Sequence, residues 1–334
     1  MKIVLINNNN ITDPRINLSI EEYCLNNLDM QQRYLLFYVN EPSIIIGKNQ
    51  NTLEEINTDF VKKNNIHVIR RMSGGGAVYH DFGNLNFSFI STYIKDKQFD
   101  FNEFTEPVID ALSKIGVHAE QSGRNDIVVN GKKISGNAQY SNGKSMVSHG
   151  TLLFESDIEK LVNALNVKDD KIQSKGLKSI KSRVANISDY LSKPMTMDLF
   201  KKKLIESIFE QYKQIPMYPL STRDWKAINE LSEKKYGTWE WNYGKSPEFN
   251  VRKINRFEIG LIDTLIYIVN CRITNIKFYG DFLGADNISD LENLLIGVRY
   301  KIEDVKNVLS EIKLNYYFGK LEPDRFVKYL FSQE

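Results

Sequence analysis

Apolar residues at helical spacing open the chain and then give way to shorter strand-like runs. Asp13 and Pro14 supply an N-cap and a first-turn proline, and the apolar positions that follow are Ile16, Ile20, Tyr23 and Cys24. Runs rich in β-branched and aromatic residues predict strands at 34–39, 43–46, 66–70 and 85–89. Helical spacing returns over 104–115, and Gly116 would end that helix.

The middle of the chain alternates strand-like runs with tight-turn signals. Asn130-Gly131 separates 126–129 from 133–135, and Asn142-Gly143 precedes the run 146–154. A further helical face extends from Phe200 to Tyr212. Antiparallel strands with helices before and after them predict an α+β domain.

An aromatic stretch marks the expected domain boundary. It contains Trp239, Trp241, Tyr243 and Pro247, and it resembles nothing before it in the chain. Beyond it, 259–268 and 273–278 are predicted strands, while 291–298 and 305–312 are predicted helices. We therefore expect a large domain over 1–247 and a small C-terminal α+β accessory domain over 248–334.

Composition narrows the class of protein. The 44 Lys and Arg nearly cancel the 42 Asp and Glu, so the basic footprint of a dedicated nucleic-acid binder is missing. Cys24 and Cys271 are the only cysteines, too few for a disulfide framework, and the first ten residues form neither a signal peptide nor a membrane span. We expect a cytoplasmic protein with no nucleic-acid or membrane partner.

Three consecutive glycines, Gly74 to Gly76, directly follow the predicted strand that ends at Arg70. Glycines allow a ligand to approach the main chain closely, and successive N–H groups can surround phosphate oxygens. The glycine spacing matches neither a Walker loop nor a dinucleotide fingerprint. A flexible hairpin connection is the alternative interpretation.

A second group of polar residues surrounds the Asn130-Gly131 turn. Lys132 and Lys133 leave the turn on a strand, so their side chains point to opposite faces and only one can enter a site. The pattern alone does not choose between them. Asn125 and Asp126 precede the turn and carry oxygen atoms of the kind that Mg²⁺ accepts beside phosphates. A cation, amide donors and a carboxylate together suit the activation of an acid by ATP, whereas a solvated surface remains the alternative.

These motifs carry a resemblance to the lipoate-protein ligases of the biotin/lipoate ligase superfamily, which implies an α+β catalytic domain with a large mixed sheet. Residues 70–81 read RRMSGGGAVYHD and are similar to the family signature RRxSGGGAVxHD. Further similar blocks follow in the family order, namely NEP at 40–42, GKNQN at 47–51, GRND at 123–126, KISGNA at 133–138, HGTL at 149–152 and KG at 175–176. The resemblance extends over residues 17–247; beyond Pro247 it is one of length and element order.

The resemblance implies a site and a reaction in two halves. ATP, with Mg²⁺, and (R)-lipoate would form lipoyl-AMP, and a lysine of a carrier protein would then take the lipoyl group. Lys133 would be the catalytic residue as a fixed cation, and Asp126 the magnesium ligand. The implied ATP-binding residues are Arg71, Gly76, Ala77, Val78, Tyr79, Lys133, Asn125, Asp126, Lys175 and Arg183. The implied lipoate-binding residues are Arg71, Ser73, Gly74, Gly75, Lys133, Gly136 and His149.

The resemblance also implies carrier proteins as partners, and two alternative functions remain open. The carriers would be lipoyl domains of 2-oxoacid dehydrogenase acyltransferase subunits, or the glycine-cleavage H protein. A lipoyl or octanoyl transferase, cysteine-dependent or cofactor-independent, is one alternative, although Cys24 and Cys271 look like core residues. A non-catalytic lipoyl-adenylate carrier is another. We expect His80 and His149 to lie near the ligand and His67 and His118 to be structural.

Overall fold

The contacts of the chain divide it into two compact units. The computed structural model describes residues 2–95, 99–165, 183–243 and 249–331. The first unit comprises Met1–Ile45, Leu53–Arg70 and Val78–Asn242, and the second comprises Ile46–Thr52, Arg71–Ala77 and Tyr243–Glu334. Two short loops from the N-terminal half of the sequence therefore belong with the C-terminal part of the chain.

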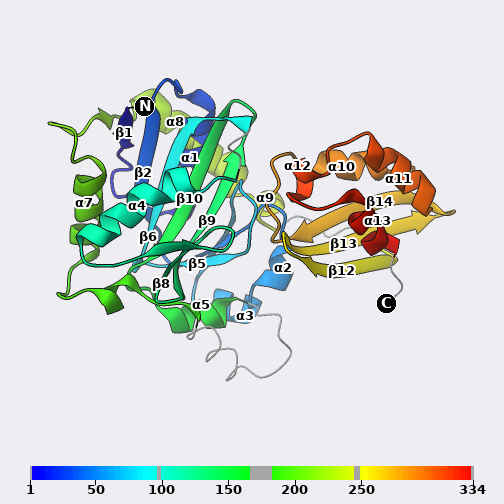
Figure 1. Ribbon diagram of the computed structural model, residues 1–334, viewed down its shortest axis with the longest axis horizontal. Helices are drawn as coiled ribbons and strands as arrows, with labels where there is room; N and C mark the ends of the chain where they lie inside the picture. Colours follow the sequence, from blue (N-terminus) through cyan, green and yellow to red (C-terminus); the bar gives the residue numbers. More distant parts are fainter. Residues whose placement is uncertain (1, 96–98, 166–182, 244–248, 332–334) are drawn as a thin grey trace. The chain divides into compact units, whose positions relative to one another are not determined.

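An eight-stranded mixed sheet is the centre of the first unit (Figure 1). β1 is parallel to both of its neighbours, and the other strands pair antiparallel. The strand order is β11 (Met217–Tyr218), β1 (Ile3–Ile6), β2 (Arg33–Val39), β6 (Asn84–Thr92), β10 (Ser145–Leu153), β9 (Lys132–Ser141), β8 (Asp126–Val129) and β7 (Glu120–Ser122). The predicted fold class, with its large mixed sheet, is confirmed.

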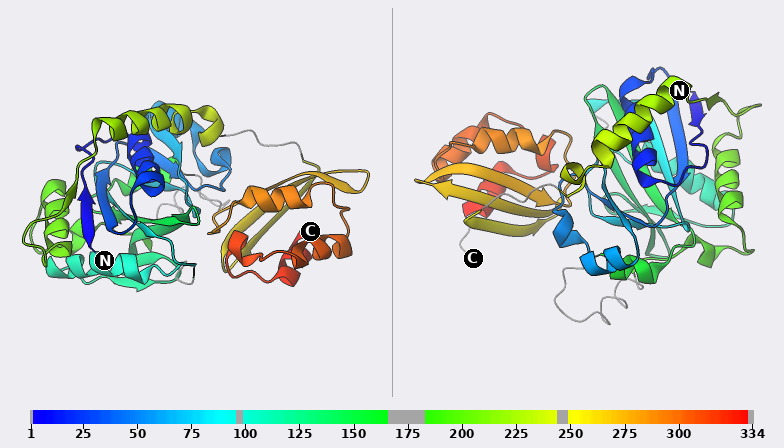
Figure 2. Two further views of the ribbon diagram at one scale, coloured as in Figure 1. Left: turned by 90° about the horizontal axis from the view of Figure 1, so that it is seen from above. Right: turned by 180° about the vertical axis from the view of Figure 1, so that it is seen from behind.

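Helices cover both faces of this sheet. α4 (Asn102–Lys114) and α7 (Met197–Ile208) pack on one face, where their apolar residues join Leu85, Phe87 and Phe89 in the main core. α1 (Pro14–Asn27) lies against β6 and β10 on the other face and packs with α8 (Thr222–Leu231), as the view from behind shows (Figure 2). Asn86 and Ser88, which alternate with the phenylalanines, are only 2% and 0% exposed. Both faces of β6 are therefore buried, and the face under α1 is polar.

Shorter elements complete the first unit. β4 (His67–Arg70), β3 (Ser43–Ile46) and β5 (Val78–His80) form a small second sheet. The remaining helical segments are α2 (Thr52–Glu55), α3 (Thr58–Lys63), α5 (Ile158–Ala164), η2 (Ile187–Tyr190), η3 (Ser232–Tyr236) and α9 (Trp239–Asn242). The strands predicted at 34–39, 43–46 and 66–70 are confirmed as β2, β3 and β4.

The predicted turns have the expected backbone. Asn130 and Gly131 both have positive φ, +50° and +74°, which is the conformation of a tight two-residue hairpin between β8 and β9. Gly116 follows α4 with a φ of +87° and ends it as predicted. These turns set the register of the strands that carry Asp126 and Lys133.

The C-terminal part of the second unit is a three-stranded antiparallel sheet packed with helices. β12 (Val251–Phe257), β13 (Gly260–Val269) and β14 (Arg272–Gly280) are joined by α10 (Ile288–Leu295), α11 (Ile302–Ser310), α12 (Asn315–Phe318) and α13 (Pro323–Phe331). Its core includes Ile262, Ile266 and Phe278. The two predicted strands and two predicted helices are confirmed, and β12, α12 and α13 are additions. Within the described residues, no helix is long and apolar enough to cross a membrane.

Candidate active site

Lys133 lies at the start of β9, beside a carboxylate of the neighbouring strand. Its Nζ is 2.8 Å from Oδ1 of Asp126 on β8, and the two side chains are 39% and 36% exposed. The following residue, Ile134, is 0% exposed in the main core, so it points away from Lys133. Lys132 is exposed. Of the two lysines, Lys133 is therefore the one that lies beside Asp126.

Gly136 keeps room for the ammonium group of Lys133. A Cβ at this position would stand 3.0 Å from Lys133 Nζ and 4.0 Å from Asp126 Oδ1. Thr151 Oγ1 on β10 accepts a hydrogen bond from the Gly136 N–H at 3.2 Å. The sequence-predicted residues Asp126, Lys133 and Gly136 are therefore brought together by the β8–β9 pair.

Asn137 on β9 ties the loop before β8 to β9. The Asn137 N–H and its side-chain amide both donate to the Asn125 carbonyl, at 2.9 and 3.0 Å. The Asn125 side chain donates in return to the Asn137 carbonyl. Gly150 makes this possible, since a Cβ there would lie 2.1 Å from Asn137 Oδ1. Asn125 is thus fixed next to Asp126 by β9.

A segment following residue 182 runs along the start of β9. Val184 forms a parallel bridge with Lys133, and the Ala185 N–H donates to the Lys133 carbonyl at 3.0 Å. Arg183, predicted to bind ATP, is exposed directly before this pairing. Lys175, the other basic residue predicted for this loop, lies outside the described residues. The backbone of Lys133 is therefore supported from two sides, by β8 and by this segment.

The Asp126 carboxylate could hold Mg²⁺ only together with oxygen atoms of a bound substrate. Mg²⁺ is usually held by one or two carboxylates together with phosphate oxygens. Asp126 and Asn125 offer oxygen atoms of this kind, although Asp126 Oδ1 already contacts Lys133. The described residues contain no group of three or more acidic, His or Cys side chains that could hold a metal. The donor set fits an ion that arrives with ATP.

The glycine loop lies in the second unit and is arranged around Arg71. The buried guanidinium donates from Nη2 to the Gly74 and Gly76 carbonyls at 2.6 and 2.9 Å, and from Nε to Ser73 Oγ at 2.9 Å. Ala77 follows in the same segment. The glycine loop is therefore held in place by hydrogen bonds from the Arg71 guanidinium, a structural role that the sequence did not indicate.

Close backbone approaches explain the first two glycines of this loop. A Cβ on Gly74 would lie 2.5 Å from the Phe282 carbonyl, and Gly75 has a φ of +90°. Gly47 is equally constrained, because its Cβ would stand 1.9 Å from the Gly75 carbonyl. Among the described residues, a Cβ on Gly76 would come within 4 Å only of Asp281 Cβ, at 3.9 Å. Gly76 is thus the glycine of the three at which an added side chain would meet the least of the described chain.

Tyr79 lies on β5, after the loop, with a buried phenol. Its side chain is 2% exposed, and its hydroxyl has no hydrogen-bond partner among the described residues. Burial, followed by the charges of Asp81 and Asp157, raises the pKa of Tyr79 to about 12. Val78, its neighbour, pairs with Ile45 of β3. The first unit therefore holds Val78 and Tyr79 in an ordered strand.

His149 belongs to a buried polar group on the α1 face of the large sheet. Its Nδ1 is 2.9 Å from Oε2 of Glu21, and Oε1 of the same carboxylate accepts from Tyr38 at 3.0 Å. Glu21 is only 1% exposed. Sequence reasoning missed Glu21 and Tyr38. Glu21 follows Asn17 by four residues, so two polar residues on one helical stripe were the signal that could have found it.

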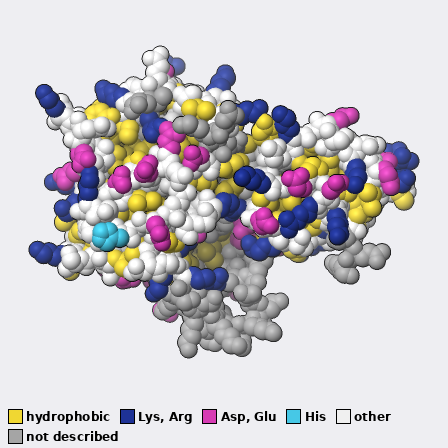
Figure 3. Space-filling model, in the orientation of Figure 1, with side chains coloured by type: hydrophobic (Ala, Val, Ile, Leu, Met, Phe, Trp, Pro, Cys, Tyr) yellow, Lys and Arg dark blue, Asp and Glu magenta, His cyan; other side chains and the backbone are white. Residues whose placement is uncertain are grey.

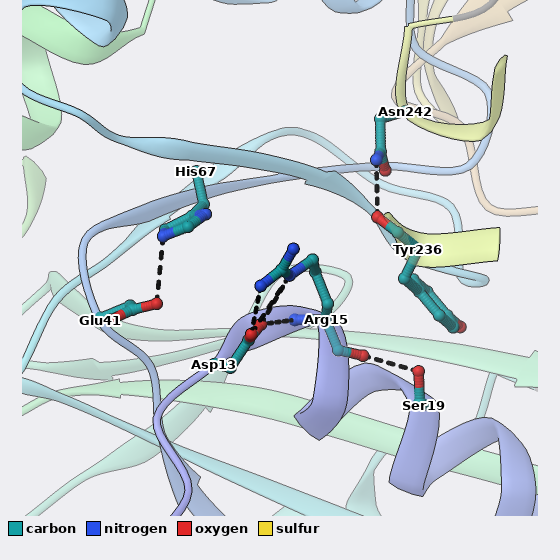
Figure 4. A network of polar contacts seen from close by, with 7 residues as sticks. All are labelled: Asp13, Arg15, Ser19, Glu41, His67, Tyr236 and Asn242. Atoms are coloured by element: carbon teal, nitrogen blue, oxygen red, sulfur yellow. Dashed lines mark hydrogen bonds and ion pairs between the residues drawn. The ribbon is translucent and has the colours of Figure 1, made fainter. Parts of the chain in front are cut away.

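The other histidines and the cysteines have ordinary surroundings. His67 Nε2 lies 3.1 Å from Glu41 Oε1 (Figure 4), and His118 is exposed. Cys24 is 0% exposed in α1, and burial raises the pKa of its thiol. A cysteine nucleophile needs an accessible thiolate, so Cys24 is unsuited to that task. Cys271 is exposed in the turn between β13 and β14.

The surface charges are mixed in sign. On the face that Figure 3 shows, Lys and Arg side chains are interspersed with Asp and Glu rather than gathered in one basic patch. This matches the near-zero formal net charge of +2. Nucleic-acid binding proteins concentrate positive charge on one face or along one helix, so this face gives no support for such a partner.

Two family models match the chain. The "Lipoyl protein ligase A/B catalytic domain" matches residues 13–209, and the "Bacterial lipoate protein ligase C-terminus" matches residues 246–330. "Lipoate-protein ligase LplJ" of Bacillus subtilis is 52% identical over 331 residues, 98% of this chain and 100% of its own length. "Lipoate--protein ligase 1" of Staphylococcus aureus is 46% identical, over 97% and 98% of the two chains.

Solved structures agree with these matches. P. falciparum LipL1 in complex with lipoate is 26% identical with a TM-score of 0.80, over 94% of this chain and 95% of that one. The bipartite ligase of Thermoplasma acidophilum, studied with its E2 lipoyl domain, is 31% identical with a TM-score of 0.66, over 75% and 100%. A lipoate-protein ligase A bound with ATP is 29% identical with a TM-score of 0.62, over 73% and 98%.

A mixed-sheet catalytic domain with a lysine–carboxylate hairpin and a small α+β domain defines a ligase of the lipoyl type. The chain belongs to the lipoate-protein ligase family. The predicted family, enzyme class and activity in protein lipoylation are confirmed at the level of this family.

Proposed function

We propose that this enzyme joins lipoate to ATP, forming lipoyl-AMP and pyrophosphate, and then transfers the lipoyl group to a lysine of a carrier protein. The observation that supports it most is the fixed ammonium group of Lys133, 2.8 Å from Asp126. A positioned cation stabilises the negative charge that develops on phosphate in the first step and on the acyl oxygen in the second. Lys133 acts through its charge and forms no covalent bond.

The binding residues follow the family assignment and remain part of the proposal. Loop backbone from Gly76 to Tyr79 would bind ATP, with Arg71 shaping that loop through its carbonyl contacts. Asn125, Asp126, Lys175 and Arg183 would complete the ATP side. Lipoate would be bound by Arg71, Ser73, Gly74, Gly75, Lys133, Gly136 and His149.

Magnesium would be held by Asp126 and the phosphates of ATP, where it would neutralise phosphate charge. Asn125 would add an amide oxygen, since its loop is fixed by Asn137. Because the described residues supply one carboxylate at this position, we expect Mg²⁺ to bind measurably only when ATP is present.

The domains, partners and compartment are proposed as follows. Residues 1–247 form the catalytic domain and 248–334 the accessory domain, which the matches at 13–209 and 246–330 support. The carriers are lipoyl domains of 2-oxoacid dehydrogenase acyltransferase subunits or the glycine-cleavage H protein; the Thermoplasma relative studied with its E2 lipoyl domain supports the former. Free cysteines support a reducing, cytoplasmic location.

Mass spectrometry of a carrier protein tests this function. The enzyme is incubated with a purified lipoyl domain, (R)-lipoate and Mg²⁺, with and without ATP. We expect one lipoyl group on one lysine, formed only with ATP and accompanied by AMP and pyrophosphate. Acyl transfer without ATP would instead identify a transferase, and binding of lipoyl-AMP without any modification would identify a carrier.

A further inference from the structure

Two Asn-Gly pairs occur in the chain, one at each end of β9. Asn130-Gly131 joins β8 to β9, and Asn142-Gly143 joins β9 to β10. A lysine follows each pair, so the local sequence is Asn-Gly-Lys in both turns. All four residues are exposed, and a Cβ on either glycine would meet no described atom within 4 Å. The two turns therefore match in sequence and in exposure, and they differ in their hydrogen bonds.

An Asn-Gly pair can react with itself, because glycine has no side chain to keep its backbone nitrogen away from the asparagine amide. The glycine nitrogen loses its proton to hydroxide and attacks the side-chain carbon Cγ. The new C–N bond closes a succinimide ring, and the side-chain nitrogen leaves as ammonia after taking a proton from water. Water then opens the ring at one of its carbonyls, which gives aspartate or isoaspartate. The reaction thus needs only water and hydroxide.

The second pair is restrained at both atoms that would join. Asn142 Oδ1 accepts from the backbone N–H groups at positions 144 and 145, at 3.0 and 2.8 Å, and its Nδ2 donates to Asn26 Oδ1 at 2.9 Å. The attacking nitrogen is engaged as well, because the Gly143 N–H donates to Ser141 Oγ at 2.9 Å. Hydrogen bonds therefore hold both the amide and the nitrogen in place, and they must be disturbed before Asn142 can react.

The first pair lacks these restraints. Within the described part of the chain, no group bonds to the Asn130 side chain or to the Gly131 N–H. Both residues have the left-handed backbone of a tight turn, with φ of +50° and +74°. The amide and the nitrogen can therefore approach each other without first losing a hydrogen bond to the protein.

We propose that Asn130 is a site of spontaneous deamidation, at which the folded enzyme forms aspartate and isoaspartate while Asn142 stays an amide. Isoaspartate carries the main chain through its Cβ, so it lengthens the turn that sets the register of β8 and β9. The added carboxylate also lies on the hairpin that holds Lys133 beside Asp126. Deamidation therefore disturbs the position of the Lys133 ammonium group. This effect on catalysis rests on the proposed function, whereas the reaction of Asn130 does not.

Peptide mapping by mass spectrometry of the stored full-length enzyme tests the reaction. The folded protein is kept in mildly alkaline buffer, and the conversion of Asn130 and Asn142 is followed in the same samples. We expect Asn130 to convert at least about ten-fold faster, because several hydrogen bonds oppose the reaction of Asn142. In urea the two rates should become similar, since both sites are Asn-Gly-Lys. Equal rates in the folded enzyme, or an unchanged ratio in urea, overturn the proposal.

Ser141→Ala tests the protection of the second pair. It removes the acceptor of the Gly143 N–H and leaves the β8–β9 turn as it is. We expect Asn142 to convert about three-fold faster or more in this variant, with the Asn130 rate unchanged as the internal control. An unchanged Asn142 rate in the folded variant would refute the explanation by hydrogen bonds.

Activity shows what the modification does to the enzyme. Asn130→Gly cannot deamidate, and a Gly-Gly pair suits the same turn; Asn142→Gly is the matched control. We expect stored Asn130→Gly to keep its lipoate-dependent ATP–pyrophosphate exchange. Stored wild-type enzyme and Asn142→Gly should lose exchange in proportion to the isoaspartate at position 130, with kcat/KM of the modified form lowered by about ten-fold.

The outcomes separate the three claims. Equal losses of exchange in all three stored proteins would refute the effect on Lys133. Absence of exchange in the fresh wild-type enzyme would refute the proposed function. In either case the conversion rates of Asn130 and Asn142 still decide whether the deamidation occurs.

Discussion

Lys133 has a carboxylate on one side and a glycine on the other, and together they determine where its ammonium group can lie. Asp126 attracts it at 2.8 Å, and Gly136 leaves the space that it occupies. Because both side chains are more than one third exposed, the ion pair adds little to stability. The ion pair matters because it fixes the position of the ammonium group. The alternation of Lys132 and Lys133 in the sequence could not decide which of the two lysines is held in this way.

Gly136→Ala should separate catalysis from folding. Its Cβ would meet Lys133 Nζ at 3.0 Å, and the flexible end of Lys133 would move instead of the backbone. We expect kcat/KM for lipoate-dependent exchange to fall by about 10- to 100-fold, since misplacement by about 1 Å can cost that much. Thermal unfolding should change by only a few degrees. Unchanged exchange in this variant would show that the ammonium position is not critical.

The Tyr79 phenol carries a cost in the ligand-free enzyme. Its buried hydroxyl has no partner among the described residues, so Tyr79→Phe should stabilise the enzyme by about 1 kcal/mol in denaturant unfolding. Tyr190→Phe is the control, because its hydroxyl donates to the Val129 carbonyl at 3.4 Å. A loss of stability in Tyr79→Phe would mean that the hydroxyl is bonded in solution.

The same residue predicts a difference at alkaline pH. Burial raises the pKa of Tyr79 from 10.0 to about 12, so the folded state holds this proton more tightly than the unfolded state. The free energy of unfolding is therefore insensitive to this proton below pH 10, and it falls as pH rises from 10 to about 12, because the unfolded state then releases the proton more readily than the folded state. Unfolding free energies measured across this window should fall more steeply for the wild-type enzyme than for Tyr79→Phe. Parallel curves would contradict the raised pKa.

At the scale of elements, turns were predictable where the residue type revealed the backbone. Asn130-Gly131 announced its hairpin, whereas Asn270 and Cys271 adopt the same left-handed pair, with φ of +49° and +58°, without a glycine to signal it. Glu21 and β12 were missed because each departs from the expected alternation of buried apolar and exposed polar residues. Glu21 is a buried carboxylate on α1, and β12 is a partly exposed strand.

Cys271→Gly should stabilise the second unit. A left-handed backbone costs a residue with a side chain about 1 kcal/mol that glycine avoids. We expect the midpoint of thermal unfolding to rise by a few degrees, with exchange activity unchanged. Cys271→Ser keeps the Cβ and should give no such rise. Equal midpoints for the two variants would show that the turn is unstrained.

For the whole molecule, sequence predicted the fold class, the α+β second domain and the hairpin between the strands of Asp126 and Lys133. It did not predict that residues 46–52 and 71–77 would pack with the C-terminal part of the chain. Those contacts are backbone approaches, such as the Gly280 N–H donating to the Asn49 carbonyl at 2.8 Å. Apolar periodicity indicates which side chains are buried, so it cannot predict contacts between backbone atoms.

The central claim is that Lys133 is the cation through which this ligase activates its acid. Lipoate-dependent ATP–pyrophosphate exchange measures that step directly, in Lys133→Met beside Lys132→Met, its neighbour on the exposed side of the strand. We expect Lys133→Met to lose about 100-fold or more in kcat, the usual effect of removing one charge-stabilising group, and Lys132→Met to stay near the wild-type rate. Near wild-type exchange in Lys133→Met, with the protein folded and ATP bound, would contradict the account.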